Sequence, residues 1–186
     1  MLSKFKRSKH QQHLAQLPKL PQTVADVRTL YAPSDFRTTL LDAIANATQR
    51  IYLVALYLEH DDAGREILNA LYQAKQRRPE LEICVLVDWH RAQRGRIGAA
   101  AANTNADWYC AMAGQHPEQS VPIYGVPVNT REALGVLHLK GFVVDDTVIY
   151  SGASINDVYL HQHEKYRYDR YQLITNEVLA DTLIDY

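Results

Sequence analysis

The sequence has little cysteine, no long hydrophobic run and almost no net charge. Its 186 residues include two cysteines, Cys84 and Cys110, which is too few for a disulfide framework or a cysteine-rich zinc site. The longest nearly unbroken apolar runs, at 51–58 and 136–144, fall well short of the ~20 residues that span a bilayer. The formal net charge of −1 is too small to indicate which class of partner the protein binds. Because 47% of the residues are hydrophobic, we expect a globular protein. The two cysteines suit the reducing environment of the cytoplasm.

The first part of the chain differs from the rest in charge. Residues 1–25 contain five basic side chains and no acidic one, with Phe5 and several leucines interleaved. Such a segment suits contact with anionic membrane lipids, at about 1 kcal/mol per basic residue near the surface. A solvated, loosely packed terminus is the alternative. We therefore divide the chain into a basic arm at 1–33 and a domain at 34–186.

From residue 34 the hydrophobic pattern alternates between helical and strand spacing. Ser34 predicts an N-cap with Asp35 in the first helical turn. Further helices are expected from Asp61 or Asp62, over 97–112 and at 177–186, and strands at 51–58, 81–87, 121–127, 136–144, 148–151 and 168–174. This order predicts an α/β sandwich with a mixed sheet. Because the last helical pattern reaches the final residue without a stop signal, we expect a part of a longer protein.

The chemically informative stretch runs from His138 to Asn156. On a strand, residues two apart share a face, so His138 and Lys140 are expected to project together. A lysine ammonium neutralises phosphoryl oxygens, and an imidazole can act as nucleophile or general acid–base near neutral pH. Asp145 begins a turn, where its side chain can bond the backbone. After the small residues at 151–153, Ser154 and Asn156 offer donors on one face.

The order His-x-Lys-x4-Asp followed by Gly-x-Ser-x-Asn resembles the signature of the phospholipase D superfamily. The stretches 88–98, 103–109 and 151–163 and the first seven residues are similar to the phosphatidylserine synthase family of Gram-negative bacteria. This resemblance implies a phospholipase D-like α/β/α sandwich, with a mixed sheet flanked by helices. It also implies a CDP-diacylglycerol–serine O-phosphatidyltransferase, peripheral to the inner face of the cytoplasmic membrane and also found with ribosomes.

The resemblance further implies a divided active site. The family carries two His-x-Lys-x4-Asp motifs, one in each half, and this sequence contains the first. We therefore expect it to be a catalytic half-domain, completed by a second half from the same full-length protein or from a homodimer mate. The implied reaction passes through a phosphatidyl-histidine that L-serine attacks. Whether His138 is the nucleophile or the acid–base stays open, and neither a metal nor another cofactor is expected because lysines supply the charge.

Four more residues are candidates for the site. Asp169, about thirty residues after His138, is assigned as the carboxylate that orients the histidine, with Glu164 as the alternative and a surface ion pair as the structural explanation. A basic loop follows the strand at 81–87, where open α/β sheets place their ligands. Its arginines suit a pyrophosphate, cytidine or lipid headgroup, or they form a solvated loop; they are Arg91, Arg94 and Arg96.

Two other functions remain open at this point. A phospholipase D-like phosphodiesterase or nuclease with a single motif can build one cleft as a homodimer. Alternatively, the chain is an inactive module that docks on a membrane or ribosome. We expect no sequence-specific nucleic-acid binding, because no stripe of alternating aromatic and basic residues is present. The pair His161 and His163 has metal-ligand side chains, but sequence spacing supplies no third ligand, so no metal site is expected.

Overall fold

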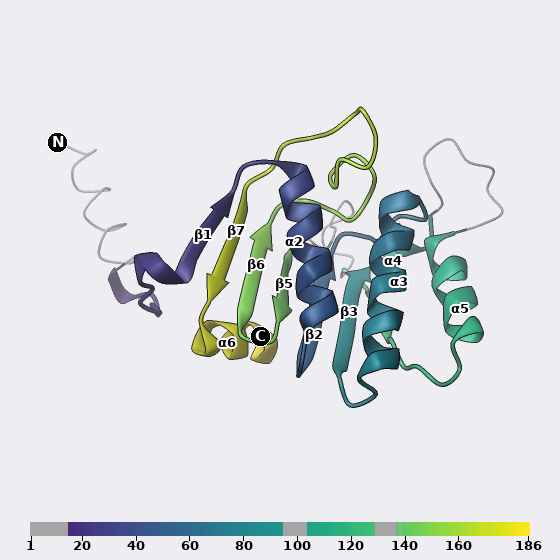
Figure 1. The fold of residues 1–186 in the computed structure, drawn as a ribbon, viewed down its shortest axis with the longest axis horizontal. Coiled ribbons are helices and arrows are strands. Elements are labelled where there is room, and N and C mark those ends of the chain that lie inside the picture. The colour runs from purple at the N-terminus through teal and green to yellow at the C-terminus, as the bar shows by residue number, and fades with distance from the viewer. Residues whose placement is uncertain (1–14, 95–103, 129–136, 138) are drawn as a thin grey trace.

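The computed structural model describes residues 15–94, 104–128, 137 and 139–186. In this part of the chain, seven strands form one sheet in the order β1-β7-β6-β5-β2-β3-β4. Figure 1 shows the sheet with helices in front of it and behind it. The strands are β1 (Val27–Leu30), β2 (Arg50–Ala55), β3 (Glu82–Asp88), β4 (Ile123–Val126), β5 (Gly141–Val144), β6 (Thr147–Ser151) and β7 (Tyr171–Thr175).

The sheet is mixed, as the sequence predicted. Strands β2, β3 and β4 are parallel, whereas β5 is antiparallel to β2 and continues through β6 and β7 to β1 in antiparallel pairs. Val54 pairs with Gly141 and Ser151 with Tyr171, so the ends of β2 and β6 adjoin the beginnings of β5 and β7. One edge of the sheet therefore carries the segments at 56–61, 89–94, 139–140, 152–157 and 168–170.

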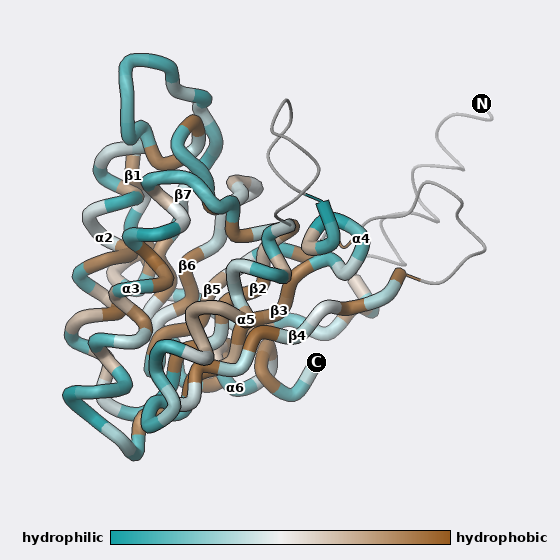
Figure 2. Tube along the Cα trace, turned by 90° about the vertical axis from the view of Figure 1, so that its right-hand side faces the viewer, coloured by the Kyte–Doolittle hydropathy of each residue, from teal (hydrophilic) through white to brown (hydrophobic). Residues whose placement is uncertain are grey.

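Helices cover both faces of the sheet. Helices α2 (Pro33–Asn46) and α3 (Asp62–Arg77) pack on one face, where Phe36, Leu40 and Leu71 belong to the main core. Helix α6 (Glu177–Asp185) packs on the opposite face through Ala180. In Figure 2, α2 and α3 alternate hydrophobic and hydrophilic residues, as amphipathic helices do. The other described helices are η1 (Val24–Asp26), α4 (Trp89–Ala92) and α5 (Asn105–Gln115). This arrangement confirms the α/β/α sandwich.

Two helix beginnings differ from the prediction. Helix α2 starts at Pro33 with Ala32 as its N-cap, so the assignment of Ser34 as the cap was wrong. Proline suits the first helical position because its φ is preset and its missing N–H needs no partner there. The helix expected over 97–112 is described from Asn105, where Thr104 forms a capping box. Residues 97–103 lie outside the described residues.

The strand expected at 136–144 is shorter. β5 begins at Gly141, so Lys140 precedes the strand. The ladder between β2 and β5 ends at the pair Val54 and Gly141, and the described residues Leu137, Leu139 and Lys140 lie outside any strand. Lys140 therefore reaches the sheet edge from a loop.

The sheet begins inside the segment assigned to the arm. β1 pairs with β7 along its whole length, and Leu30 is buried in the main core. A short edge strand between prolines gives a weak sequence signal, which explains why 27–30 was not predicted. Contact of the basic arm with lipid stays a prediction for the residues before β1, of which 1–14 lie outside the described residues. Among the helices that are described, none has the length and hydrophobicity needed to cross a membrane.

Candidate functional site

The predicted site residues gather at one edge of the sheet. Lys140 precedes β5, Ser154 and Asn156 follow β6, Asp169 precedes β7, and Arg91 lies in α4 directly after β3. This is the edge at which β2 and β3 end, and ligands of open α/β sheets bind at such carboxyl ends. The sequence therefore brings most of its candidate residues to one place. His138 and Arg96 lie outside the described residues.

Lys140 and Asp169 both bond to the backbone of Gly152, an arrangement that we call the Gly152 clamp. The Lys140 ammonium donates a hydrogen bond to the Gly152 carbonyl oxygen, and the Gly152 N–H donates to Asp169 Oδ1 over 3.2 Å. A Cβ at residue 152 would lie 2.8 Å from Asp169 Oδ2, so only glycine fits without displacing the carboxylate. Two residues 29 positions apart are thus held against one loop.

An open pocket adjoins this clamp. It has a volume of about 310 Å³ and is lined by Leu139, Lys140, Tyr150, Ser151 and Gly152. A lysine ammonium has three N–H donors. Within the described residues, one N–H of Lys140 donates to Gly152, and the other two N–H groups can donate to a ligand in the pocket. The arrangement suits an anion.

Asn156 is held by its own loop and by the end of β2. Its Nδ2 donates to the Tyr57 hydroxyl over 3.1 Å, and its Oδ1 accepts from the Tyr159 N–H at 2.9 Å. The Arg91 guanidinium lies over the Tyr57 ring, 5.1 Å from the ring centre. Burial raises the pKa of the Tyr57 hydroxyl and the Arg91 charge partly offsets this, so Tyr57 stays protonated at neutral pH. Contacts therefore run from Asn156 through Tyr57 to Arg91.

The two other described candidates lie less openly in the site. Ser154 is buried, and the next residue, Ile155, pairs with Leu58 and accepts from the Glu59 N–H at 2.9 Å. Arg94 is exposed, and its carbonyl oxygen accepts from the Asn105 N–H, which joins the loop after α4 to α5. The backbone next to Ser154 is therefore fixed against the segment that follows β2, whereas the Arg94 side chain is exposed to solvent.

Asp145 lies at the opposite end of β5 from Lys140. Five residues of extended chain correspond to about 16 Å. Its carboxylate accepts hydrogen bonds from the N–H groups of Thr48, Gln49 and Arg50 over 2.8–3.2 Å, and its φ is +49°. Burial raises its pKa, but these hydrogen bonds prevail and hold the pKa below the ordinary 3.8. The predicted side-chain-to-backbone bonds are present, and they hold the turn after β5 against residues 48–50, whereas a catalytic part for Asp145 stays a prediction.

Asp88, which sequence reasoning did not select, connects two parts of the site. It is the last residue of β3 and is completely buried. Its Oδ1 accepts from the Arg91 N–H, and its Oδ2 from the Leu137 N–H, both at 2.8 Å. A carboxylate ending an apolar strand is the sequence signal that points to such a residue.

Comparisons with known proteins agree with this geometry. A family model described as "Cardiolipin synthase, PLD-like domain" matches residues 40–164. The chain is 71% identical over 186 residues to the CDP-diacylglycerol–serine O-phosphatidyltransferase PssA of Escherichia coli K12. It is 51% identical over 188 residues to the corresponding enzyme of Haemophilus influenzae. Each alignment covers 100% of this chain and 41% of the relative, so the chain spans about two fifths of their length.

Solved structures show the same fold. The crystal structure of phosphatidylserine synthase from Haemophilus influenzae superposes with a TM-score of 0.89 at 51% identity, covering 97% of this chain and 40% of that one. The phospholipase D family member Nuc from Salmonella typhimurium gives a TM-score of 0.57 at 22% identity, covering 86% of this chain and 89% of that one. These likenesses confirm the predicted phospholipase D-like fold and the resemblance stated from the sequence.

Proposed function

The chain belongs to the family described as "Cardiolipin synthase, PLD-like domain", and from this premise we propose that it supplies half of the active site of a CDP-diacylglycerol–serine O-phosphatidyltransferase. The observation that carries the proposal is the 71% identity across the whole chain to the Escherichia coli enzyme of that name. The substrates are then CDP-diacylglycerol and L-serine, and the products are phosphatidylserine and CMP. The pocket beside Lys140 supports a site for an anionic substrate.

The proposed reaction has two displacements at one phosphorus atom. A histidine nitrogen attacks the phosphorus that bears the diacylglycerol oxygen, and the bond to the oxygen shared with CMP breaks. CMP leaves with that electron pair, which needs little acid assistance because a phosphate is weakly basic. The L-serine hydroxyl then attacks the phosphatidyl-histidine while a second histidine takes its proton. His138 is one of the two histidines, and its counterpart comes from the second half of the site.

The described residues account for stabilisation of the phosphoryl oxygens. Lys140 supplies a positive charge and two N–H donors beside the pocket. Asn156 and Ser154 lie on the loop that the Gly152 clamp holds in place. Arg91 lies in α4 rather than in the loop that the sequence predicted, and Arg94 follows this helix. Together with Arg96, these arginines suit the cytidine-bearing phosphate or an anionic headgroup. Because lysine and arginine side chains neutralise the charge of the phosphoryl oxygens, the proposed reaction needs no metal ion.

Asp169 is proposed to orient the reactive imidazole. It lies across Gly152 from Lys140, so a carboxylate is present where the motif lysine is anchored. A carboxylate that accepts from one imidazole nitrogen fixes the tautomer and leaves the other nitrogen to react. Asp169 Oδ1 already accepts from the Gly152 and Arg170 N–H groups, and these bonds hold the side chain in position.

Partners and location follow from the proposed reaction. The second half comes from the same full-length protein or from a homodimer mate, because two histidines are needed. A lipid substrate brings the enzyme to anionic lipids at the inner face of the cytoplasmic membrane, with the basic residues at 1–25 as the contacting segment. Binding to ribosomes would use the same basic surface.

The test is to trap the intermediate on the full-length enzyme that carries this chain. The enzyme is mixed with CDP-diacylglycerol without serine, quenched and digested, and peptides are searched for added phosphatidyl mass. We expect the mass on the His138 peptide or on the second-half peptide, loss of turnover in His138→Ala, and normal turnover in His161→Ala. Mass on the second-half peptide assigns acid–base chemistry to His138. Absence of the mass from both peptides overturns the covalent mechanism.

Serine dependence separates this function from the alternatives. The synthase forms phosphatidylserine, and releases CMP beyond about one equivalent per active site, only when serine is present. We expect the 186-residue chain alone to form little or no phosphatidylserine. A homodimeric phosphodiesterase would hydrolyse a phosphodiester at the same rate with or without serine. If the chain is a docking module, the full-length protein would sediment with anionic liposomes but would release no CMP from CDP-diacylglycerol. Either of these results would overturn the synthase proposal.

A further inference from the structure

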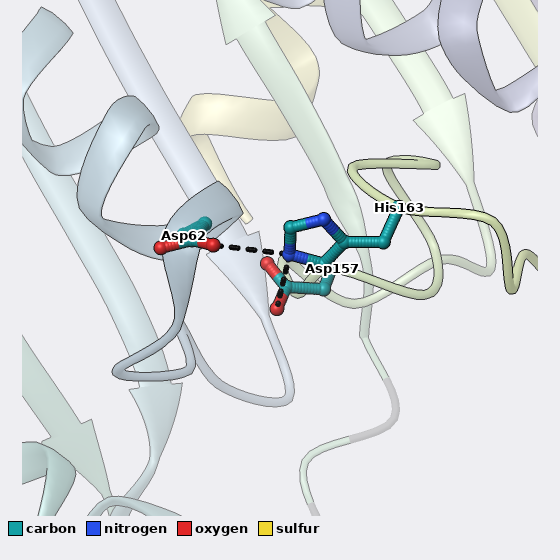
Figure 3. A group of neighbouring side chains, drawn as sticks. All are labelled: Asp62, Asp157 and His163. Atoms are coloured by element: carbon teal, nitrogen blue, oxygen red, sulfur yellow. Dashed lines mark hydrogen bonds and ion pairs between the residues drawn. The ribbon is translucent and has the colours of Figure 1, made fainter.

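Three metal-ligating side chains from distant parts of the sequence meet beside the proposed site (Figure 3). Asp62 is the first residue of α3, whereas Asp157 and His163 lie in the segment after β6. His163 Nε2 is 3.0 Å from Asp62 Oδ2 and 3.6 Å from Asp157 Oδ2. The three ligand atoms lie within 4.8 Å of one another. Sequence spacing gave no third ligand because Asp62 is 101 positions from His163.

The distances suit ligands around a single small cation. Zinc-type ions bind nitrogen and oxygen at about 2.0–2.2 Å in tetrahedral sites, which places ligand atoms about 3.3 Å apart. The two measured separations, 3.0 and 3.6 Å, lie on either side of that value. A histidine ion pair needs one carboxylate, whereas here two carboxylates face the same imidazole nitrogen. His163 is 61% exposed, so an ion has access from solvent.

The outer oxygens of both carboxylates have partners of their own. Asp157 Oδ1 accepts from the Ala63 N–H at 2.8 Å, and Asp62 Oδ1 pairs with the Arg65 guanidinium. Each carboxylate is therefore oriented from behind, and its other oxygen faces His163. Such supporting hydrogen bonds typically orient the ligands of metal sites in proteins.

A buried acceptor lies next to the cluster. Gln162 precedes His163 and lines a surface pocket together with Asp62. Its Oε1 is buried and has no hydrogen-bond partner among the described residues. Buried acceptors normally have partners, and an unpaired one is a common sign of a water or ion beside it. A water molecule in the pocket that Gln162 shares with Asp62 would supply the missing donor.

We propose that Asp62, Asp157 and His163 form a binding site for a divalent transition-metal ion, with Zn²⁺ as the representative ion. The imidazole nitrogen favours this class over Mg²⁺ and Ca²⁺, which prefer oxygen ligands throughout. The site is structural: the ion joins the Asn156-bearing segment to the beginning of α3. That connection already exists in part, because Asp61 Oδ2 accepts from the Asp157 N–H at 2.8 Å.

The test is zinc titration of the metal-free 186-residue chain by calorimetry, with Co²⁺ absorption as the report on ligand geometry. His163→Gln removes the nitrogen ligand, and Asp157→Asn weakens one oxygen ligand. The matched control is His161→Gln, because His161 is two residues from His163, packs on Tyr166 and belongs to no metal-ligand cluster among the described residues. The control also accounts for binding by other histidines.

We expect the wild-type chain and His161→Gln to bind one more Zn²⁺ than His163→Gln. Asp157→Asn should weaken that site about 10-fold or more. Saturating Zn²⁺ should raise the melting temperature of the wild-type chain by about 5 °C or more, and that of His163→Gln much less. Equal stoichiometry in wild-type and His163→Gln chains would overturn the site. So would a destabilisation of His163→Gln that is the same with and without zinc, since that result describes an ion pair only.

Discussion

The Asp88 carboxylate accepts a hydrogen bond from the Leu137 backbone N–H at 2.8 Å, and this bond ties the end of β3 to the residue directly before His138. The same carboxylate accepts from the Arg91 N–H at 2.8 Å. One completely buried side chain thus positions the segment before the motif histidine and the helix that bears Arg91. In the proposed reaction these two segments contact the same substrate, so Asp88 sets their relative position.

We expect Asp88→Asn to destabilise the fold and impair the site. The amide retains one acceptor oxygen, so one of the two N–H groups faces another donor inside the protein. Leaving a buried N–H unpaired costs about 1–3 kcal/mol in the free energy of unfolding. Urea unfolding of the 186-residue chain measures this loss, with the exposed Asp42→Asn as the control. Equal unfolding free energies for the two variants would show that Asp88 contributes nothing.

Asp145 should make stability depend on pH in the acid range. Its backbone hydrogen bonds lower its folded-state pKa below 3.8, so the stabilisation is complete above about pH 4. It is lost as the pH falls through the unfolded value towards the lower folded one. Asp145→Asn should therefore be less stable than wild type at pH 7, and the difference should shrink as the pH approaches 3.

The measurement for Asp145 is urea unfolding at several pH values between 3 and 7. Asn tolerates the positive φ of this position, so the substitution tests the charge and its acceptors rather than the backbone. Asp146→Asn in the same turn is the matched control, because within the described part of the chain the Asp146 carboxylate bonds the Arg50 side chain and no backbone N–H. A constant difference between wild type and Asp145→Asn across this range would contradict the assignment.

The sequence predicted local features better than long-range ones. Asp61 caps α3 and β3 ends at Asp88, because capping residues and apolar runs depend on neighbours in the chain. The length of β5 depends on its pairing with β2, and Gly141, its first residue, is the last one paired in that ladder. Strand order follows from packing, and a short edge strand such as 27–30 gains its stability from β7 rather than from its own residues.

The candidate site shows the same division. The structure brings Lys140, Asn156 and Asp169 to one end of the strands, although the sequence had predicted Lys140 and Asp169 within strands that begin only at Gly141 and Tyr171. Their roles in the site stay predictions. The partner of Asn156 is Tyr57, 99 positions away, and the shared partner of Lys140 and Asp169 is a backbone peptide. Contacts of this kind have no spacing signal in a single sequence, so only the folded chain reveals them.

The close approach of Gly152 and Asp169 predicts two coupled variants. Gly152→Ala places a methyl group 2.8 Å from Asp169 Oδ2, so the carboxylate must move. If Asp169 orients the imidazole, Gly152→Ala and Asp169→Asn should both lower kcat of the full-length enzyme, by about 10²–10⁴-fold for the latter. Because both act through the same carboxylate, the double variant should be little slower than Asp169→Asn alone.

Steady-state rates across a pH series provide the check on this pair. A displaced orienting carboxylate changes the pKa that governs kcat, whereas simple loss of folded protein lowers the rate equally at every pH. Urea unfolding of the same variants shows whether the fold is retained. Near-normal turnover of Asp169→Asn would exclude the orienting role, and Glu164 would become the residue to test.

Arg91 should contribute to substrate binding more than to the chemical step. Its guanidinium lies over Tyr57 at the edge that holds Lys140 and Asn156, where it can pair with the cytidine-bearing phosphate. Arg91→Ala should lose a charge-assisted hydrogen bond of about 1.5–3 kcal/mol. This loss corresponds to a roughly 10- to 100-fold rise in KM for CDP-diacylglycerol. Arg91→Lys should recover part of this, since it keeps the charge without the planar fork. The control variant is Arg77→Ala, because Arg77 is an exposed arginine in the last turn of α3. A fall in kcat of the Arg91 variant at unchanged KM would instead show that Arg91 stabilises the transition state.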